Sequence, residues 1–265
     1  MGMLRRDQLG REVEMPEHPE RIISLCPSLT ETLFALGVGD RVVGRTRHCI
    51  HPQGQVKRAQ NVGGTKDVHE EVIASLNPDL ILCEKEENTK EIVDSLSTKY
   101  PVYVVDVHTV EDALTMVADL GVVVDARDEA QRLVQEIRTE LQDLPTDRPR
   151  TMAYLIWKDP YMAAGGDTYL DSLLTRAGFV NVFGHSESRY PQIAIAQLQA
   201  LSPDVVFLSS EPYPFKEAHR ANLQSLLPDA QVKLIDGEIC WNGARMRYAV
   251  SVLRRVQKEL EGISH

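Results

Sequence analysis

The stretch of sequence that decides the fold occurs twice in this chain. Residues 71–82 read EVIASLNPDLIL, and residues 196–207, 125 positions further on, read AQLQALSPDVVF. Each copy opens with a short amphipathic helical pattern, and a proline ends it because the residue before proline avoids the α conformation. A continuous apolar run follows, which is typical of a strand buried on both faces of a parallel sheet. The repeat therefore predicts one helix–strand unit in each half of the chain.

Further short apolar runs accompany each copy. They cover residues 21–26, 102–105, 152–157 and 232–235. Strands that alternate with helical stretches indicate βαβ units, and hence parallel sheets covered by helices. One set lies before about residue 120 and the other after about residue 150, within the usual size of a domain. The sequence predicts an α/β fold made of two parallel-sheet lobes.

A long helix is expected between the two lobes. Within residues 126–144 the apolar side chains fall on one helical stripe, at Ala130, Leu133, Val134, Ile137 and Leu141. No Gly or Pro interrupts the stretch before Pro145, so the helix should be about 27 Å long at 1.5 Å per residue. We expect an N-terminal lobe over residues 1–122, a single linking backbone helix over 123–146, and a C-terminal lobe over 147–265. Such a stiff link predicts only modest movement of the lobes.

The composition narrows the class of protein. A net charge of −10 excludes a typical nucleic-acid partner, because such proteins cluster Lys and Arg to replace phosphate counterions. No apolar window is long enough to span a membrane. The N-terminal residues show no signal peptide. We therefore expect a periplasmic or cell-surface protein if an export signal has been removed, and otherwise a cytoplasmic one. We also expect a monomer.

No motif for catalysis is visible. The sequence lacks a GxSxG elbow, a P-loop, a GxGxxG turn after a strand and an HExxH helix. The glycines at 63 and 64 lack the spacing of a phosphate loop, and residues 165–168 predict a turn into a helix capped by Asp167. We expect a binding protein that is not an enzyme and requires no cofactor.

Several segments together resemble a known family. They are RIISLCPSLTE at 21–31, VGGT at 62–65, the two L-x-P-D segments, NVF at 181–183 and YPQ at 190–192. Their order and spacing resemble the helical-backbone (class III) substrate-binding proteins of ABC importers, which bind cobalamin, haem or ferric siderophores. The resemblance covers about residues 21–260 and is nearest to the cobalamin-binding branch.

The resemblance implies a small metal-chelate ligand, a corrinoid such as cobalamin, held in a cleft between the lobes. The carboxyl ends of the strands are also where open parallel sheets bind ligands. In the first lobe the resemblance implies contacts from Pro27, Ser28, His48, Thr65, Lys66 and Glu84. From the second lobe it implies Trp157, Met162, Tyr190, Trp241 and Arg245.

Other interpretations of these residues stay open. Trp157 and Trp241, the only tryptophans, suit a flat macrocycle but are equally compatible with core packing. Tyr190 lies in a loop before Pro191, where a large ring is less easily explained as core. Arg245 could meet a carboxylate or an amide of the ligand, or form a surface ion pair.

A direct metal site is a second open possibility. His48, with His51 nearby, could ligate a metal, although the cobalamin pattern carries an aromatic at the position of His48. Three cysteines, Cys26, Cys83 and Cys240, also follow or end predicted strands. Their spacing matches no known cage, and the absence of CxxC pairs excludes a zinc ribbon. Haem, a ferric siderophore or a metal ion are therefore alternative ligands, and a cytoplasmic enzyme or chaperone of tetrapyrrole metabolism is an alternative class.

The expected transporter partner depends on surface charge. In the resembled importers, one glutamate on each lobe meets arginines of the permease, and the first of these matches Glu71. The internal repeat gives the second position as Ala196, which carries no charge. The sequence thus predicts that the first lobe can dock to an ABC permease through Glu71. It argues against an equivalent ion pair between the second lobe and the permease.

Overall fold

A computed structural model describes residues 2–144 and 149–262, which fold as two compact units. The first unit contains the chain up to Val107 together with Glu111–Ile137 and Trp241–Arg245. The second contains His108–Val110, Arg138–Cys240 and the chain from Met246. The linking helix expected over residues 123–146 is shorter in the structure: it begins at Arg127 and ends at Gln142. The expected lobe boundary at residues 146 and 147 lies outside the described residues.

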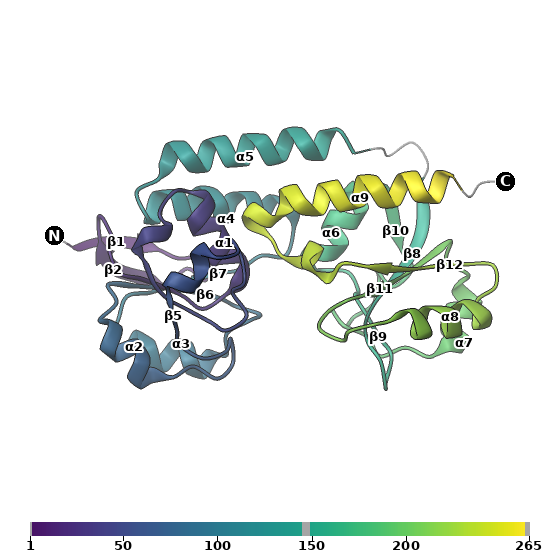
Figure 1. Cartoon of the computed structure of the whole chain (residues 1–265), viewed down its shortest axis with the longest axis horizontal. Coiled ribbons are helices and arrows are strands. Elements are labelled where there is room, and N and C mark those ends of the chain that lie inside the picture. Colours follow the sequence, from purple (N-terminus) through teal and green to yellow (C-terminus); the bar gives the residue numbers. More distant parts are fainter. Residues whose placement is uncertain (1, 145–148, 263–265) are drawn as a thin grey trace. The chain divides into compact units, whose positions relative to one another are not determined.

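The first unit is built on a five-stranded sheet in the order β5-β4-β3-β6-β7. Its strands are all parallel: β3 (Ile22–Ser24), β4 (Val42–Arg45), β5 (Gln60–Asn61), β6 (Leu80–Glu84) and β7 (Val102–Val105). The helices of this part are α1 (Pro27–Ala35), α2 (Glu70–Leu76), α3 (Lys90–Ser97) and α4 (Val110–Val123), with short 3₁₀ turns at Gly39–Arg41 and Gln55–Arg58. Figure 1 shows α2 and α3 on one face of the sheet.

The second unit repeats this arrangement. Parallel strands β8 (Arg150–Trp157), β10 (Phe179–Asn181), β11 (Val205–Ser209) and β12 (Gln231–Ile235) lie in the order β10-β8-β11-β12, and β9 (Met162–Ala163) pairs antiparallel with β8. The helices are α6 (Tyr169–Arg176), α7 (Ile195–Leu201), α8 (Glu217–Leu226) and α9 (Met246–Glu261), with 3₁₀ turns at Gly237–Cys240 and Gly243–Arg245. Figure 1 shows α7 and α8 together on one side of the strands. The predicted α/β class with parallel sheets is confirmed.

The sequence repeat is also a structural repeat. Helix α2 and strand β6 match α7 and β11, and each helix ends in a left-handed residue, Asn77 or Ser202. The aspartates that follow the two prolines explain why the same spacing recurs in both copies, because each makes the same kind of hydrogen bonds. Asp79 accepts hydrogen bonds from the main-chain N–H groups of Glu20 and Arg21, both at 2.9 Å. Asp204 likewise accepts from the N–H and the hydroxyl of Thr151, both at 2.7 Å. Each aspartate thus ties its own strand to the start of a neighbouring strand.

The cores explain why the decisive runs are continuously apolar. Every residue of β6 and of β11 is buried, since helices cover both faces of each sheet. On one face, Ile81 and Cys83 pack with Ile73 of α2 and Leu96 of α3. On the matching face of the second unit, residues of β11 pack with Leu198 of α7 and Leu223 of α8.

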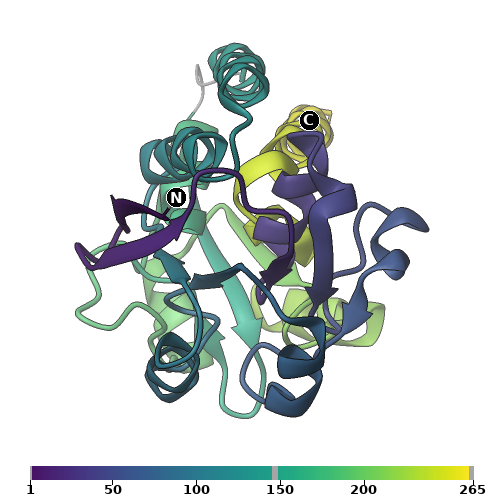
Figure 2. The ribbon, with the colours of Figure 1, turned by 90° about the vertical axis from the view of Figure 1, so that its left-hand side faces the viewer.

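A β-hairpin precedes the first sheet and was not predicted. Strands β1 (Gly2–Arg6) and β2 (Glu12–Pro16) pair antiparallel, and appear as the purple ribbon near the N-terminus in Figure 2. Residues at the tip of the hairpin form hydrogen bonds with main-chain groups along the free edge of strand β7. Gln8 accepts from Asp106 N–H at 2.9 Å and its own N–H donates to the carbonyl of Val104 at 3.2 Å. The buried carboxylate of Asp7 accepts from the N–H of Val104, and Arg11 donates to the carbonyl of Val102.

The expected long helix is present as α5 (Arg127–Gln142), with Ala130, Leu133, Ile137 and Leu141 buried along its stripe. No helix among the described residues is both long and apolar enough to cross a membrane.

Candidate functional site

The candidate residues of both units follow the carboxyl ends of parallel strands. In the first unit, Pro27 and Ser28 follow β3, His48 follows β4, Thr65 and Lys66 follow β5, and Glu84 ends β6. In the second unit, Trp157 ends β8, Met162 lies in β9 and Tyr190 lies in the loop after β10. These are the edges at which open parallel sheets present ligand-binding loops.

Pro27 and Ser28 form the first turn of α1. Proline suits the first helical position because its missing N–H needs no partner there. No side chain caps this helix, and its first turn carries no acidic residue. Ser28 is buried, and its hydroxyl lies 3.2 Å from the Sγ atom of Cys26. The main-chain N–H groups and the positive end of the helix dipole are thus presented at the carboxyl edge of the sheet.

His48, Thr65 and Lys66 lie on the loops that follow β4 and β5. His48 and Lys66 are exposed, while Thr65 is half-buried and its carbonyl accepts from Asn88 Nδ2 at 2.9 Å. The two loops are joined by an ion pair of 2.5 Å between Arg47 and Asp67, and the Arg47 hydrogen bond lowers the pKa of Asp67. These loops therefore form a polar rim in the first unit, with Lys66 as an exposed cation.

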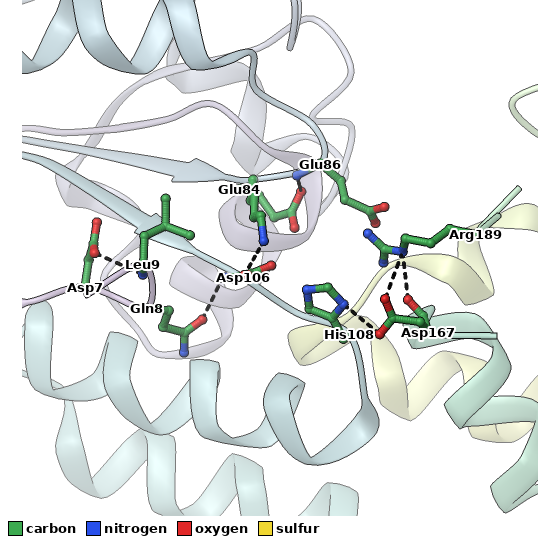
Figure 3. A network of polar contacts seen from close by, with 10 residues as sticks. Asp7, Gln8, Leu9, Glu84, Glu86, Asp106, His108, Asp167 and Arg189 are labelled. Carbon is green, nitrogen blue, oxygen red and sulfur yellow. Dashed lines mark hydrogen bonds and ion pairs between the residues drawn. The ribbon is translucent and has the colours of Figure 1, made fainter. Parts of the chain in front are cut away.

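Glu84 has a more internal position than we expected. It is 4% exposed, and its Oε2 atom accepts hydrogen bonds from the N–H groups of Glu86 and Glu87, both at 2.8 Å (Figure 3). Its own N–H donates to Asn88 Oδ1 at 2.9 Å. Burial raises the pKa of Glu84 to about 7, more than these hydrogen bonds lower it. Glu84 thus shapes the loop after β6, and a ligand contact by its carboxylate stays a prediction.

Trp241 and Arg245 form a packed group with two residues of the first unit. The Trp241 ring meets the edge of the His51 ring at a centroid distance of 5.8 Å, and the Arg245 guanidinium lies 5.9 Å from the Trp241 ring. Arg245 also pairs with Glu31 of α1 at 3.3 Å, with both side chains largely buried. The alternative interpretation of Arg245 as part of an ion pair is therefore right about the pair but wrong about its surface position. The pair is largely buried and fixes the guanidinium beside the indole of Trp241.

The sequence interpretation assigned Trp241 and Arg245 to the second lobe, and this assignment is corrected. The structure groups residues 241–245 with the first unit. The N–H of Ala244 donates to Thr32 Oγ1 of α1 at 3.0 Å. Gly243 has a φ of +70°, and a Cβ at this position would collide with Thr32 Oγ1, so only glycine allows the close approach.

Trp157, Met162 and Tyr190 lie on β8, on β9 and in the loop that bridges to β9. Met162 lies opposite Trp157 in the β8–β9 pairing and opposite Gln192 in an isolated bridge. Tyr190 precedes this bridge, and the Gly165 N–H donates to the carbonyl of Arg189 at 2.8 Å, which ties the Tyr190 loop to the segment after β9. Trp157 is 40% exposed and Tyr190 is 37% exposed, which argues against the core-packing interpretation for both. The second unit therefore offers an apolar, accessible surface.

A polar group supports the Tyr190 loop (Figure 3). Arg189 Nε donates to the carbonyl of Asp167 at 2.7 Å, and its guanidinium lies 6.0 Å from the Tyr190 ring. The carboxylate of Asp167 lies 3.1 Å from His108 Nδ1. The prediction that Asp167 caps α6 is wrong: Thr168 is the cap, and its hydroxyl accepts from the N–H of Asp171 at 3.1 Å. Asp167, at a φ of +55°, instead holds the loop of Tyr190 in place.

The described residues contain no group of three or more His, Cys, Asp or Glu side chains that could hold a metal ion. The direct cysteine–histidine site therefore finds no support in this part of the chain. Burial raises the pKa of the Cys26, Cys83 and Cys240 thiols. His48 as a lone axial ligand of a chelate stays a prediction.

Two partner residues were missed from the sequence. Glu31 has no motif of its own, because its role depends on the return of residues 241–245 to α1. Tyr213 stands between two prolines in the loop after β11, where a large ring could have been noticed by the reasoning applied to Tyr190. It lies beside Trp157, at a centroid distance of 5.7 Å.

Two parallel α/β units that each carry polar or aromatic side chains at the carboxyl ends of their strands define a two-lobed ligand-binding protein. A family model described as "periplasmic binding protein" matches residues 22–233. The chain belongs to this family of periplasmic binding proteins.

Similar proteins carry the same architecture. A vitamin B12-binding protein of Vibrio parahaemolyticus is 28% identical over 201 residues, which is 73% of this chain and 72% of the relative. The crystal structure of the periplasmic vitamin B12 binding protein BtuF of Vibrio cholerae superimposes with a TM-score of 0.71 and 23% identity, covering 93% of this chain and 98% of that one. A periplasmic heme binding protein from Pseudomonas aeruginosa has a TM-score of 0.77 and 22% identity, covering 90% and 92%. The helical-backbone class predicted from the sequence is thereby confirmed.

Proposed function

We propose that this protein binds a corrinoid, such as cobalamin, and delivers it unchanged to an ABC permease. The observation that carries the proposal is the exposure of two aromatic side chains, Trp157 at the end of β8 and Tyr190 in the loop that bridges to β9. Flat, largely apolar rings with polar substituents suit such a surface. The relatives named as vitamin B12-binding proteins support the choice of ligand.

We further propose that the first unit carries polar groups that can contact the ligand. Its carboxyl-edge loops present the N-terminus of α1, the exposed His48 and Lys66, and the fixed Arg245. These groups can donate hydrogen bonds to the amide side chains of a corrin ring. The proposed binding requires no catalytic residue, and we propose a location outside the cytoplasmic membrane, as for the named periplasmic relatives.

The test is calorimetric titration of the purified protein with cyanocobalamin and cobinamide. We expect a dissociation constant in the micromolar range or below, equivalent to about −8 kcal/mol or better. Tyr190→Ala and Trp241→Ala should each weaken binding by about 1–3 kcal/mol, the usual cost of removing an aromatic contact. Absence of heat with both corrinoids at about 100 μM ligand would refute the corrinoid assignment and leave the family assignment unaffected.

A haem ligand is the second candidate, and the exposed imidazole of His48 after β4 is the observation that favours it. A neutral imidazole is a common axial ligand of haem iron. Titration with haemin, followed by absorbance between 350 and 600 nm, separates the two ligands. A shift of the haemin Soret band on adding the protein, which His48→Ala abolishes, would favour haem over the corrinoid.

A further inference from the structure

Tyr213 lies in the loop between strand β11 and helix α8. This loop follows the carboxyl end of β11, which is an inner strand of the second sheet. The Tyr213 N–H donates to the carbonyl of Ile156 at 3.3 Å, so the loop is tied to the end of β8. Tyr213 therefore stands at the same sheet edge as Trp157, in the loop after the neighbouring strand.

The rings of Tyr213 and Trp157 form an edge-to-face pair. Their centroids are 5.7 Å apart and their planes meet at 68°, which is a favourable geometry for two aromatic rings. Trp157 is 40% exposed and Tyr213 is half-buried, so neither ring is enclosed by the core. The pair adds a second ring to the accessible apolar surface at Trp157 and its strand partner Met162.

Tyr213 is held from behind by two further rings. The Phe215 ring lies 4.8 Å from it and the His219 ring 5.6 Å, while Phe215 itself is a buried member of the core. His219 is fixed in turn, because its Nδ1 atom accepts from the N–H of Lys216 at 3.0 Å at the start of α8. Tyr213 is thus pre-positioned, which lowers the entropic cost of using it to bind a ligand.

Lys158 follows Trp157 directly and forms an ion pair with Asp159, with Nζ and Oδ2 3.0 Å apart. The pKa of Lys158 is raised mainly by its hydrogen bond with Asp159, and Tyr213 and Tyr161 add to the effect through their proximity. A phenol hydroxyl and an ammonium group beside an apolar face can serve the amide or carboxylate substituents at the rim of a tetrapyrrole.

We infer that Tyr213 is a further ligand-binding residue, which forms with Trp157 a two-ring wall against a flat metal chelate. This inference rests on the proposed function. The Tyr213 ring supplies the apolar contact, and its hydroxyl is directed to the polar rim of the ligand. Phe215 and His219 act as positioning residues for the ring.

The experiment compares Tyr213→Leu, Tyr213→Phe and the control Tyr100→Leu by titration with cyanocobalamin. Tyr100 is also half-buried and packs on the core of its own unit, but it stands before the amino end of β7. We expect Tyr213→Leu to weaken binding about 5- to 50-fold, Tyr213→Phe to weaken it less, and Tyr100→Leu to leave it unchanged. Equal affinity of Tyr213→Leu and the unmodified protein, or equal losses in Tyr213→Leu and Tyr213→Phe, would overturn the inference.

Tryptophan fluorescence provides a second readout that needs no ligand. The chain has only two tryptophans, so Trp241→Phe leaves Trp157 as the sole reporter. In this background Tyr213→Leu should shift the emission of ligand-free Trp157, and Tyr100→Leu should not. An unshifted emission contradicts the ring contact. If the unmodified protein binds neither cyanocobalamin nor haemin, the proposed function fails and takes the binding role of Tyr213 with it; unaltered corrinoid binding by Tyr213→Leu refutes the inference alone.

Discussion

Glu84 is a buried carboxyl group whose protonation is linked to folding. Its pKa is raised from about 4.5 to about 7 in the folded protein, chiefly because burial penalises the charged form. The folded state therefore retains a proton that the unfolded chain releases between about pH 4.5 and 7. Stability should fall as the pH rises through this window, by a linkage on the order of 3 kcal/mol at most.

The substitution Glu84→Gln tests this linkage. The glutamine oxygen can still accept from the N–H groups of Glu86 and Glu87, but it does not titrate. We expect urea unfolding of the unmodified protein to lose stability between pH 5 and pH 7 relative to Glu84→Gln. If the free energy of unfolding depends on pH in the same way for both proteins, Glu84 is not the group whose raised pKa is linked to folding.

The positions of the candidate residues could be predicted from the sequence, but several of their side-chain contacts could not. The carboxyl-edge position of the candidates could be predicted, because it follows from strand order alone. The buried pair of Arg245 with Glu31 could not, since it depends on residues 241–245 returning to α1. The burial of Glu84 was missed because a charged run, EKEE at 84–87, normally indicates a solvated loop.

At the scale of elements, Asp79 and Asp204 hold equivalent strand junctions in the two units. Each accepts two hydrogen bonds from the start of an adjacent strand. We expect Asp79→Ala and Asp204→Ala each to lower the free energy of unfolding by about 1–3 kcal/mol, because main-chain donors lose their partner. Chemical denaturation measures the loss, with Asp229→Ala, at an exposed loop position, as the control. If neither variant loses more stability than the control, the two aspartates do not stabilise the strand junctions.

The elements that the sequence predicted are those with long apolar runs. Strands β6 and β11 are buried throughout, so their signal is continuous. The hairpin of β1 and β2 was missed because β1 is largely exposed and shows no apolar alternation. Strands β9 and β10 were missed because two or three residues carry no periodicity and pair only through the tertiary fold.

At the scale of the whole molecule, the charge at the heads of α2 and α7 bears on a transporter partner. Glu71 and Ala196 hold equivalent, exposed positions at the first turns of these helices. If a permease presents arginines to both, Ala196→Glu should speed docking at low salt, since rim charges act mainly on association rate. Surface plasmon resonance on a cobalamin permease measures the rate. Corrinoid affinity should stay the same, and an unchanged docking rate at low salt would refute the role assigned to this position.

The tip of the N-terminal hairpin has a consequence for the molecule in solution. The family match begins at Ile22, so Asp7, Gln8 and Arg11, which hydrogen-bond to the β7 edge, precede the matched residues. An uncovered edge strand is a template on which a second chain can add a strand. By covering this edge, the hairpin tip removes a place where two molecules could pair, and we expect its removal to favour self-association.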